Sequence, residues 1–146
     1  MATTRATRAP WHLWLLGIAG IAWYGIAGSD YVLAKLGGAQ YLRDFGLTEP
    51  QISYTLGLPA YMTAVWAVGV WGGLLGAVLL LLRNRLAAPV FAVSLIAYLF
   101  SLLHLFVLTD GGRVMGGMVP AQWAVLVGGI LFAAYSAAMV RQGLLR

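Results

Sequence analysis

Polar side chains recur at helical spacing within an otherwise apolar segment, residues 86–109. Tyr98, Ser101 and His104 follow Ser94 at distances of four, seven and ten residues along the chain. A helix turns by about 100° per residue, so these spacings keep the four side chains near one face. Hydroxyl groups beside an imidazole can line a binding pocket, and an imidazole can also ligate haem or a metal. This face is therefore the first candidate for a functional site.

Two further apolar segments carry polar stripes that match this face. Residues 11–36 place three polar side chains on one side, and residues 119–140 align Gln122 with small residues. At about 1.5 Å per residue, Tyr31 and His104 lie about 27–30 Å from the starts of their segments, and hence at similar depth. We therefore expect an outward-opening polar pocket lined by Tyr24, Tyr31, Lys35, Tyr98, Ser101, His104 and Gln122. The alternative is that these groups satisfy one another between helices, as polar side chains commonly do in membrane bundles.

Catalytic, metal and cofactor chemistry has little support in the chain. His12 is the only other histidine and lies at the opposite membrane face from His104, so the two cannot clamp one haem. There is no cysteine, and no carboxylate shares the His104 face at ligand spacing. No Ser-His-Asp set, phosphate-binding glycine loop or pair of carboxylates occurs at catalytic spacing. We therefore expect no enzyme, no cofactor and no metal site.

Asp30 is an acidic residue within the first apolar segment, which makes it a candidate for proton coupling. It falls near the outer end of that segment, where water is close, and about 100° away from the stripe of Tyr31 and Lys35. The alternative is an interfacial residue that pairs with a base of the following polar connection. We expect this second role, with Arg43 as the partner.

Glycines form a packing face in the segment from Pro59 to Arg85. Two overlapping G-x-x-x-G spacings occur there, and their glycines share one side of a helix. A side that lacks side chains lets another helix approach closely, either in the same chain or in a second one. The last apolar segment has a similar face of small residues. The predicted packing residues are Gly69, Gly72, Gly73, Gly76, Gly129, Ala133 and Ala137.

Composition predicts an integral membrane protein. Of the 146 residues, 62% are hydrophobic and only 9% are charged, and the mean hydropathy is +0.87. Soluble domains carry about 25% charged residues. We expect one all-α domain, residues 1–146, built as a four-helix membrane bundle with spans 11–36, 59–82, 86–109 and 119–140. A cleaved signal peptide ending at Gly25-Ile26-Ala27 is the alternative interpretation of the first span.

The only long polar connection, residues 37–58, is expected to form a short amphipathic helical lid on the outer side. Two glycines end the first span, since glycine readily adopts the left-handed cap conformation. Thr48 and Gln51 have the spacing of a capping box, and Pro50 is tolerated in the first turn of a helix. The connection is therefore predicted to be folded rather than a loose tether.

Charged residues divide between the two ends of the predicted bundle. One end carries bases alone: Arg5, Arg8, Arg83, Arg85, Arg141 and Arg146. The other end carries Lys35, Arg43 and Arg113 together with all four acids. Because basic residues favour the cytoplasm, we expect both termini on that side. The bases form no continuous run, so the lipid bilayer is an expected partner and nucleic acid is not.

Four motifs between residues 25 and 100 stand out together. They are a glycine-rich first span with Gly25, Gly28 and Lys35, the sequence G-V-W-G-G-L-L-G-A-V-L-L-L-L, the basic turn R-N-R and the sequence A-A-P-V-F. In these motifs the chain resembles the DoxX-like group of small four-helix bacterial membrane proteins. It is also similar to short bacterial chains labelled sugar transporters by automatic transfer. The resemblance implies the bacterial cytoplasmic (inner) membrane, and partners in oxidative-stress or respiratory complexes.

Two functions remain open at this point. The first is a non-catalytic bundle that forms a homo-oligomer or joins a larger membrane complex, through Gly69 and Gly73 or through the face of Ala133 and Ala137. The second is a binder or transporter of a small solute or lipophilic molecule, which would use the pocket beneath the lid. The residues favour the first function, because polar side chains within a bundle usually satisfy one another.

Overall fold

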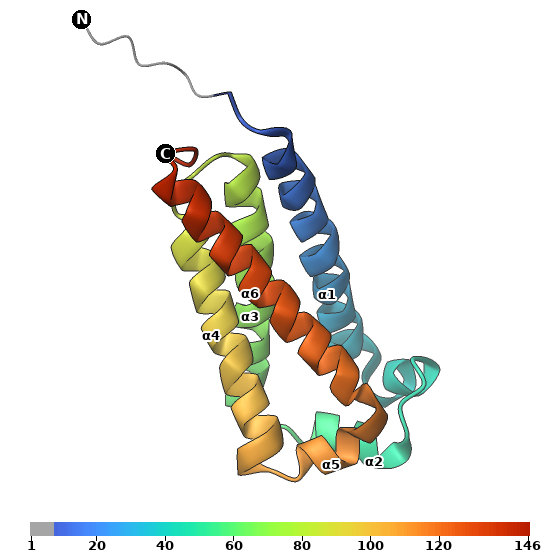
Figure 1. Ribbon diagram of the computed structural model, residues 1–146. Coiled ribbons are helices and arrows are strands. Elements are labelled where there is room, and N and C mark those ends of the chain that lie inside the picture. Colours follow the sequence, from blue (N-terminus) through green and yellow to red (C-terminus); the bar gives the residue numbers. More distant parts are fainter. Residues whose placement is uncertain (1–7) are drawn as a thin grey trace, which may run out of the picture.

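The computed structural model describes residues 8–146, and all regular structure in this range is helical (Figure 1). The elements are α1 (Trp11–Asp44), α2 (Glu49–Leu56), α3 (Ala60–Leu81), α4 (Ala87–Leu103), η1 (His104–Leu108), α5 (Gly111–Met115), η2 (Gly116–Met118) and α6 (Val119–Arg141). Here η1 is a π-helix and η2 is a 3₁₀-helix. The predicted all-α class is confirmed.

Four helical stretches are long and apolar enough to cross a membrane. They are Trp11–Asp44, Ala60–Leu81, Ala87–Leu108 and Gly111–Arg141, which confirms the predicted number of such segments. In Figure 1, α1, α3 and α4 run alongside one another and α6 crosses in front of them at an angle, with the start of α1 and the C-terminus at the same end. The short helices α2 and α5 lie at the opposite end.

α1 extends beyond its predicted end, because helical structure resumes directly after a kink at Gly38 (φ +54°, ψ −137°). Beyond the kink, the Tyr41 hydroxyl donates a hydrogen bond to the Asp30 carboxylate over 2.7 Å. Arg43 forms an ion pair of 2.6 Å with Glu49 of α2, and its hydrogen bond holds the pKa of the Glu49 carboxyl below its usual range. The predicted pair of Asp30 with Arg43 is therefore wrong, because the kink brings Tyr41 rather than Arg43 to Asp30.

α3 lies between α1 and α4 and takes both neighbours on its glycine face, which consists of Gly69, Gly72, Gly73 and Gly76. The Tyr24 ring of α1 occupies the space that a side chain at Gly73 would fill. The Phe91 ring of α4 lies 2.9 Å from the Cβ position of Gly76. On the same side, the Ser94 hydroxyl of α4 donates a hydrogen bond to the carbonyl of Gly69. The glycine face thus packs helices of one chain together.

Three aromatic rings from three helices meet beside this face. The ring centroids of Phe91 and Phe132 are 5.6 Å apart and nearly parallel, with an angle of 13° between the rings. The Tyr24 ring lies 6.0 Å from Phe91 and 5.7 Å from Phe132. All three side chains are buried, so this cluster joins α1, α4 and α6 at the level of the glycine face.

α6 packs on α4 through its predicted face of small residues. Gly129 is buried against a leucine of α4, Ala133 is partly buried against the core, and Ala137 is half-buried. At the end that carries the termini, the His12 ring and the Tyr135 hydroxyl form a hydrogen bond that joins α1 to α6. Both predicted packing faces are therefore used within the chain.

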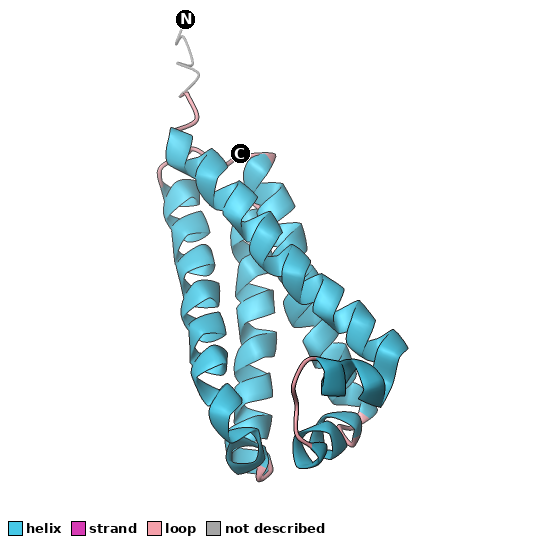
Figure 2. Cartoon of the chain, turned by 90° about the vertical axis from the view of Figure 1, so that its right-hand side faces the viewer, coloured by secondary structure: helices cyan, strands magenta, loops and turns pink. Residues whose placement is uncertain are grey.

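The helix α2 lies against both α1 and α5 at the end opposite the termini. Figure 2 shows the short helical segments at this end of the molecule. On one side Ile52 is buried with residues of α1. On the other side, the Tyr54 hydroxyl lies 2.8 Å from the Thr109 hydroxyl, and the Gln51 amide donates to the Met115 carbonyl over 3.3 Å. Gln51 also accepts a hydrogen bond from the Thr48 backbone N–H, as the predicted capping box requires.

Replacing Gly73 with alanine is expected to lower the free energy of unfolding by about 1–3 kcal/mol, because the added methyl group would overlap the Tyr24 ring. Gly25→Ala is the matched control, since nothing lies within 4 Å of its Cβ position. Unfolding in detergent, followed by circular dichroism, measures both. If Gly73→Ala keeps its stability and instead changes the oligomeric state, the glycine face packs between chains.

Thr109→Val is expected to loosen α2, because valine removes the hydroxyl that bonds Tyr54. The lost bond to Tyr54, about 0.5–1.5 kcal/mol, should speed hydrogen exchange in residues 49–56 by about two- to tenfold. The same hydroxyl also bonds the His104 carbonyl and the Gly111 N–H, so exchange in residues 104–108 should speed up as well. Ser101→Ala is the control, since the Ser101 hydroxyl bonds only the Ala97 carbonyl of its own helix. Equal exchange in both variants would show that this bond does not hold α2.

Candidate functional site

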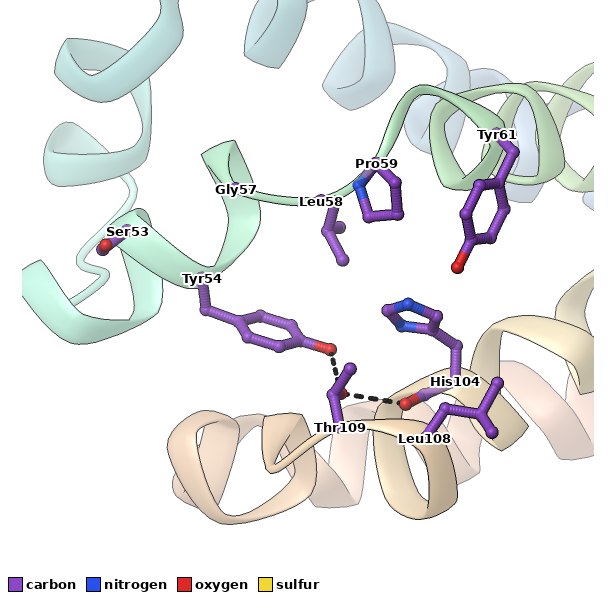
Figure 3. A pocket seen from close by; sticks show the side chains of 9 residues that line it. All are labelled: Ser53, Tyr54, Gly57, Leu58, Pro59, Tyr61, His104, Leu108 and Thr109. Carbon is purple, nitrogen blue, oxygen red and sulfur yellow. Dashed lines mark hydrogen bonds between the residues drawn. The ribbon is translucent and has the colours of Figure 1, made fainter.

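A pocket of about 460 Å³ opens between α2, the start of α3 and the π-helix η1 (Figure 3). It lies at the end of the molecule opposite the termini. Its lining residues are Ser53, Tyr54, Gly57, Leu58, Pro59, Tyr61, His104, Leu108 and Thr109. The lining combines hydroxyl groups and one imidazole with apolar side chains, and none of these residues is charged.

The π-helix places His104 at the pocket. α4 widens at His104, and helical structure ends at Thr109, whose backbone is extended (φ −139°, ψ 170°). The Thr109 hydroxyl donates a hydrogen bond of 2.9 Å to the His104 carbonyl, so the Tyr54 hydroxyl donates to Thr109 in turn. The backbone N–H of Gly111 also donates to the Thr109 hydroxyl. π-helical segments of this kind are frequent at functional sites.

His104 is buried, with 5% of its surface exposed, yet its ring has no hydrogen-bond partner within residues 8–146. In the same range, every fully enclosed polar side-chain atom has a partner. The ring nitrogens of His104 are therefore accessible from the pocket rather than sealed inside the protein. The imidazole packs edge-to-face against the Tyr61 ring, with 6.1 Å between ring centroids. A neutral imidazole offers one donor and one acceptor to a bound molecule.

Tyr61 completes the polar side of the pocket. Its side chain is 53% exposed, and in Figure 3 its hydroxyl lies on the side of the His104 ring. No other described residue hydrogen-bonds this hydroxyl. The Tyr61 hydroxyl and the His104 ring are therefore two polar groups of the pocket that the protein itself leaves available.

The hydroxyl groups of the pocket are of two kinds. Those of Tyr54 and Thr109 are engaged with each other and with the backbone. The Tyr61 hydroxyl lies beside the His104 ring and has no hydrogen-bond partner among the described residues. Among residues 8–146, no group of three or more metal-ligating side chains is clustered.

The residues predicted to line one pocket are distributed over several places, and only His104 lines this one. Tyr24 is in the aromatic core. The Tyr98 hydroxyl lies 2.7 Å from the Gln122 side-chain oxygen and 2.8 Å from its backbone carbonyl, to which it donates. Ser101 bonds its own helix. These pairs follow the alternative weighed above, in which polar groups satisfy one another.

Tyr31 and Lys35 form a separate cluster with α3. The Tyr31 ring packs edge-to-face on Trp66 at 4.7 Å, and the Lys35 ammonium donates to the Thr63 hydroxyl over 3.0 Å. Lys35 also lies 5.9 Å from the centre of the Trp66 ring, in cation–π geometry. The physical reason for the separation is that α1 packs on α3 at this end, so its stripe does not reach His104 in η1.

Sequence reasoning missed Tyr54, Tyr61 and Thr109. Thr109 precedes the glycine-rich turn and Tyr61 follows Pro59, so both occupy helix ends where side chains can turn toward a neighbouring element. Tyr54 had no distinguishing signal, because its role depends on where α2 lies. The π-helix also had no signal in the spacing of the polar residues.

A second hollow of about 460 Å³ lies along α1 and α3, lined by Gly25, Gly28, Ser29, Val32, Leu33 and Trp71. Its only side-chain polar group apart from the Trp71 indole is the Ser29 hydroxyl, which donates to the Gly25 carbonyl of its own helix. The apolar side chains here are exposed, as expected for a surface that faces lipid. This hollow is therefore the lesser candidate.

Comparisons with protein-family models, curated proteins and solved structures give no match. The resemblance to the DoxX-like group therefore stays a prediction.

Proposed function

We propose that this protein is an integral membrane four-helix bundle that binds a small, uncharged molecule in the pocket at His104, with α2 as its lid. The observation that carries the proposal is the buried His104 ring, whose nitrogens have no partner among the described residues and reach the pocket. An imidazole left available in a pocket of this size points to a ligand.

The lining residues define the chemical class of the ligand. The absence of charged side chains from the lining disfavours an ion, because a charge would be desolvated without compensation. The His104 ring and the Tyr61 hydroxyl provide hydrogen bonds, while Leu58, Pro59 and Leu108 provide apolar contact. The volume of about 460 Å³ falls within the range of about 300–1,000 Å³ typical of small-molecule sites. A neutral amphiphile with a hydrogen-bonding head fits this combination.

The position of the pocket favours a molecule that is taken from the membrane. α4 contains 17 residues up to Leu103, or about 25 Å of helix, so His104 would lie near the edge of a hydrocarbon core of about 30 Å. At the rim of the pocket, Tyr61 and Leu108 are 53% and 58% exposed. A rim of this kind would contact lipid or its interface, where amphiphilic molecules concentrate.

Association with a second copy or a larger complex is the weaker proposal. The glycine face of α3 and the small-residue face of α6 are occupied by α1 and α4 of the same chain. We also propose that the protein is non-catalytic and that both termini lie in the cytoplasm. The bases at the end that carries the termini support this orientation. The inner membrane of a bacterium rests on the DoxX-like resemblance alone.

Native mass spectrometry of the protein, extracted gently from its own membrane, tests the proposal. We expect a discrete small-molecule mass on the protein, with occupancy about two- to tenfold lower in Tyr61→Phe, which loses one hydrogen bond to the ligand. Since no described residue bonds the Tyr61 hydroxyl, this variant should keep its stability.

Tyr98→Phe is the matched control. It removes a hydroxyl that bonds Gln122, so it should lose about 1 kcal/mol of stability and retain the ligand. Equal loss of ligand in both variants would contradict the site. If the extracted protein carries no small molecule and is part of a defined larger assembly, the accessory function would replace ligand binding as the proposal.

A further inference from the structure

The end of the molecule that carries the termini is closed by a backbone pairing between two distant segments, residues 83–85 and 144–146, which we name the arginine clamp. The Arg85 N–H donates to the backbone oxygen of Arg146 over 3.0 Å, and the Arg146 N–H donates to the Arg83 carbonyl over 2.8 Å. The Arg83 side chain donates to the Leu144 carbonyl. Leu145, between the paired residues 144 and 146, is buried in the core and holds this segment in place.

Two left-handed turns create the clamp. Gly143 has φ +70° and ends α6, while Arg83 has φ +56° and ends α3. A residue other than glycine at such an angle costs about 1–2 kcal/mol and persists only where its surroundings hold it. The backbone bond between Arg83 and Arg146 and the buried Leu145 supply that support.

Exposed positive charge gathers at this end of the molecule. Arg85 and Arg146 are exposed on paired backbone, and Arg141 is exposed at the end of α6. The four acids of the chain, Asp30, Asp44, Glu49 and Asp110, lie at the opposite end, as does the ion pair of Arg43 with Glu49. Like charges repel one another, and a bound anion relieves that repulsion.

We propose that the arginine clamp binds the phosphate of an anionic phospholipid. Guanidinium groups match phosphate oxygens through paired, charge-assisted hydrogen bonds. Two apolar side chains flank the basic turn, Leu82 at 70% and Leu86 at 53% exposed, and would contact acyl chains. Free phosphate would satisfy the arginines but leave these leucines unpartnered, whereas a lipid satisfies both.

Exposed tryptophans support a lipid surface at this level. Trp11 is 74% exposed and Trp14 is 48% exposed, both at the start of α1 and therefore at the end that carries the clamp. Tryptophan favours the depth of lipid headgroups. The clamp lies at the opposite end from the His104 pocket, so the two proposals can fail separately.

Delipidated protein in neutral detergent, titrated with phosphatidylglycerol and observed by native mass spectrometry, tests the clamp. We expect phosphatidylglycerol to bind at least about tenfold more tightly than phosphatidylcholine, with inorganic phosphate weaker than the anionic lipid. The double variant Arg85→Gln, Arg146→Gln should weaken phosphatidylglycerol binding by about 30-fold, at about fivefold for each base.

Arg113→Gln is the matched control, because Arg113 is an exposed arginine at the opposite end. It should bind phosphatidylglycerol like the wild type. Thermal unfolding should be the same for all three proteins, since glutamine leaves the backbone pairing intact. The proposal is overturned by equal binding of the two lipids, by equal weakening in the control, or by inorganic phosphate that binds as tightly as phosphatidylglycerol.

Discussion

Close approach at the glycine face of α3 controls the arrangement of the other long helices. The Tyr24 ring fills the space above Gly73 from one side, and the Phe91 ring lies above Gly76 from the other. Both rings also pack against Phe132 of α6, so the same contacts fix the position of α6 beside the glycine face. Lipid provides no hydrophobic force between helices, so dispersion contacts of this kind carry the packing. A side chain at either glycine would separate α1, α3 and α4 together.

The position of α3 between α1 and α4 explains why the polar groups divide as they do. Toward the end opposite the termini, Tyr31 and Lys35 reach Trp66 and Thr63 of α3 rather than His104 of η1. The neighbours of His104 in the pocket therefore come from α2 and the start of α3 rather than from α1. α2 itself extends from α1 to the region after η1. The pocket is consequently built mainly by the segment that connects α1 to α3. Of the polar residues predicted to line a pocket, only His104 is among its lining residues.

Features with a local cause could be predicted from the sequence. The four apolar stretches, the glycine face and the Thr48–Gln51 cap depend on residue type and short spacing. Partners across the fold could not be predicted, because helical periodicity gives the face of a side chain but not the helix opposite. Asp30 illustrates this limit: its partner, Tyr41, depends on the backbone angles of Gly38.

The pocket and α2 share one chain of hydrogen bonds. Tyr54 of α2 donates to Thr109, and Thr109 donates to the carbonyl of His104, the residue whose ring reaches the pocket. Any displacement of α2 therefore removes a partner from the last turn of the helix that positions the imidazole. Conversely, a ligand that fixes the His104 ring would stabilise the π-helical turn and the Thr109 hydroxyl that holds α2. Since linkage is reciprocal, occupancy of the pocket and attachment of α2 must favour each other.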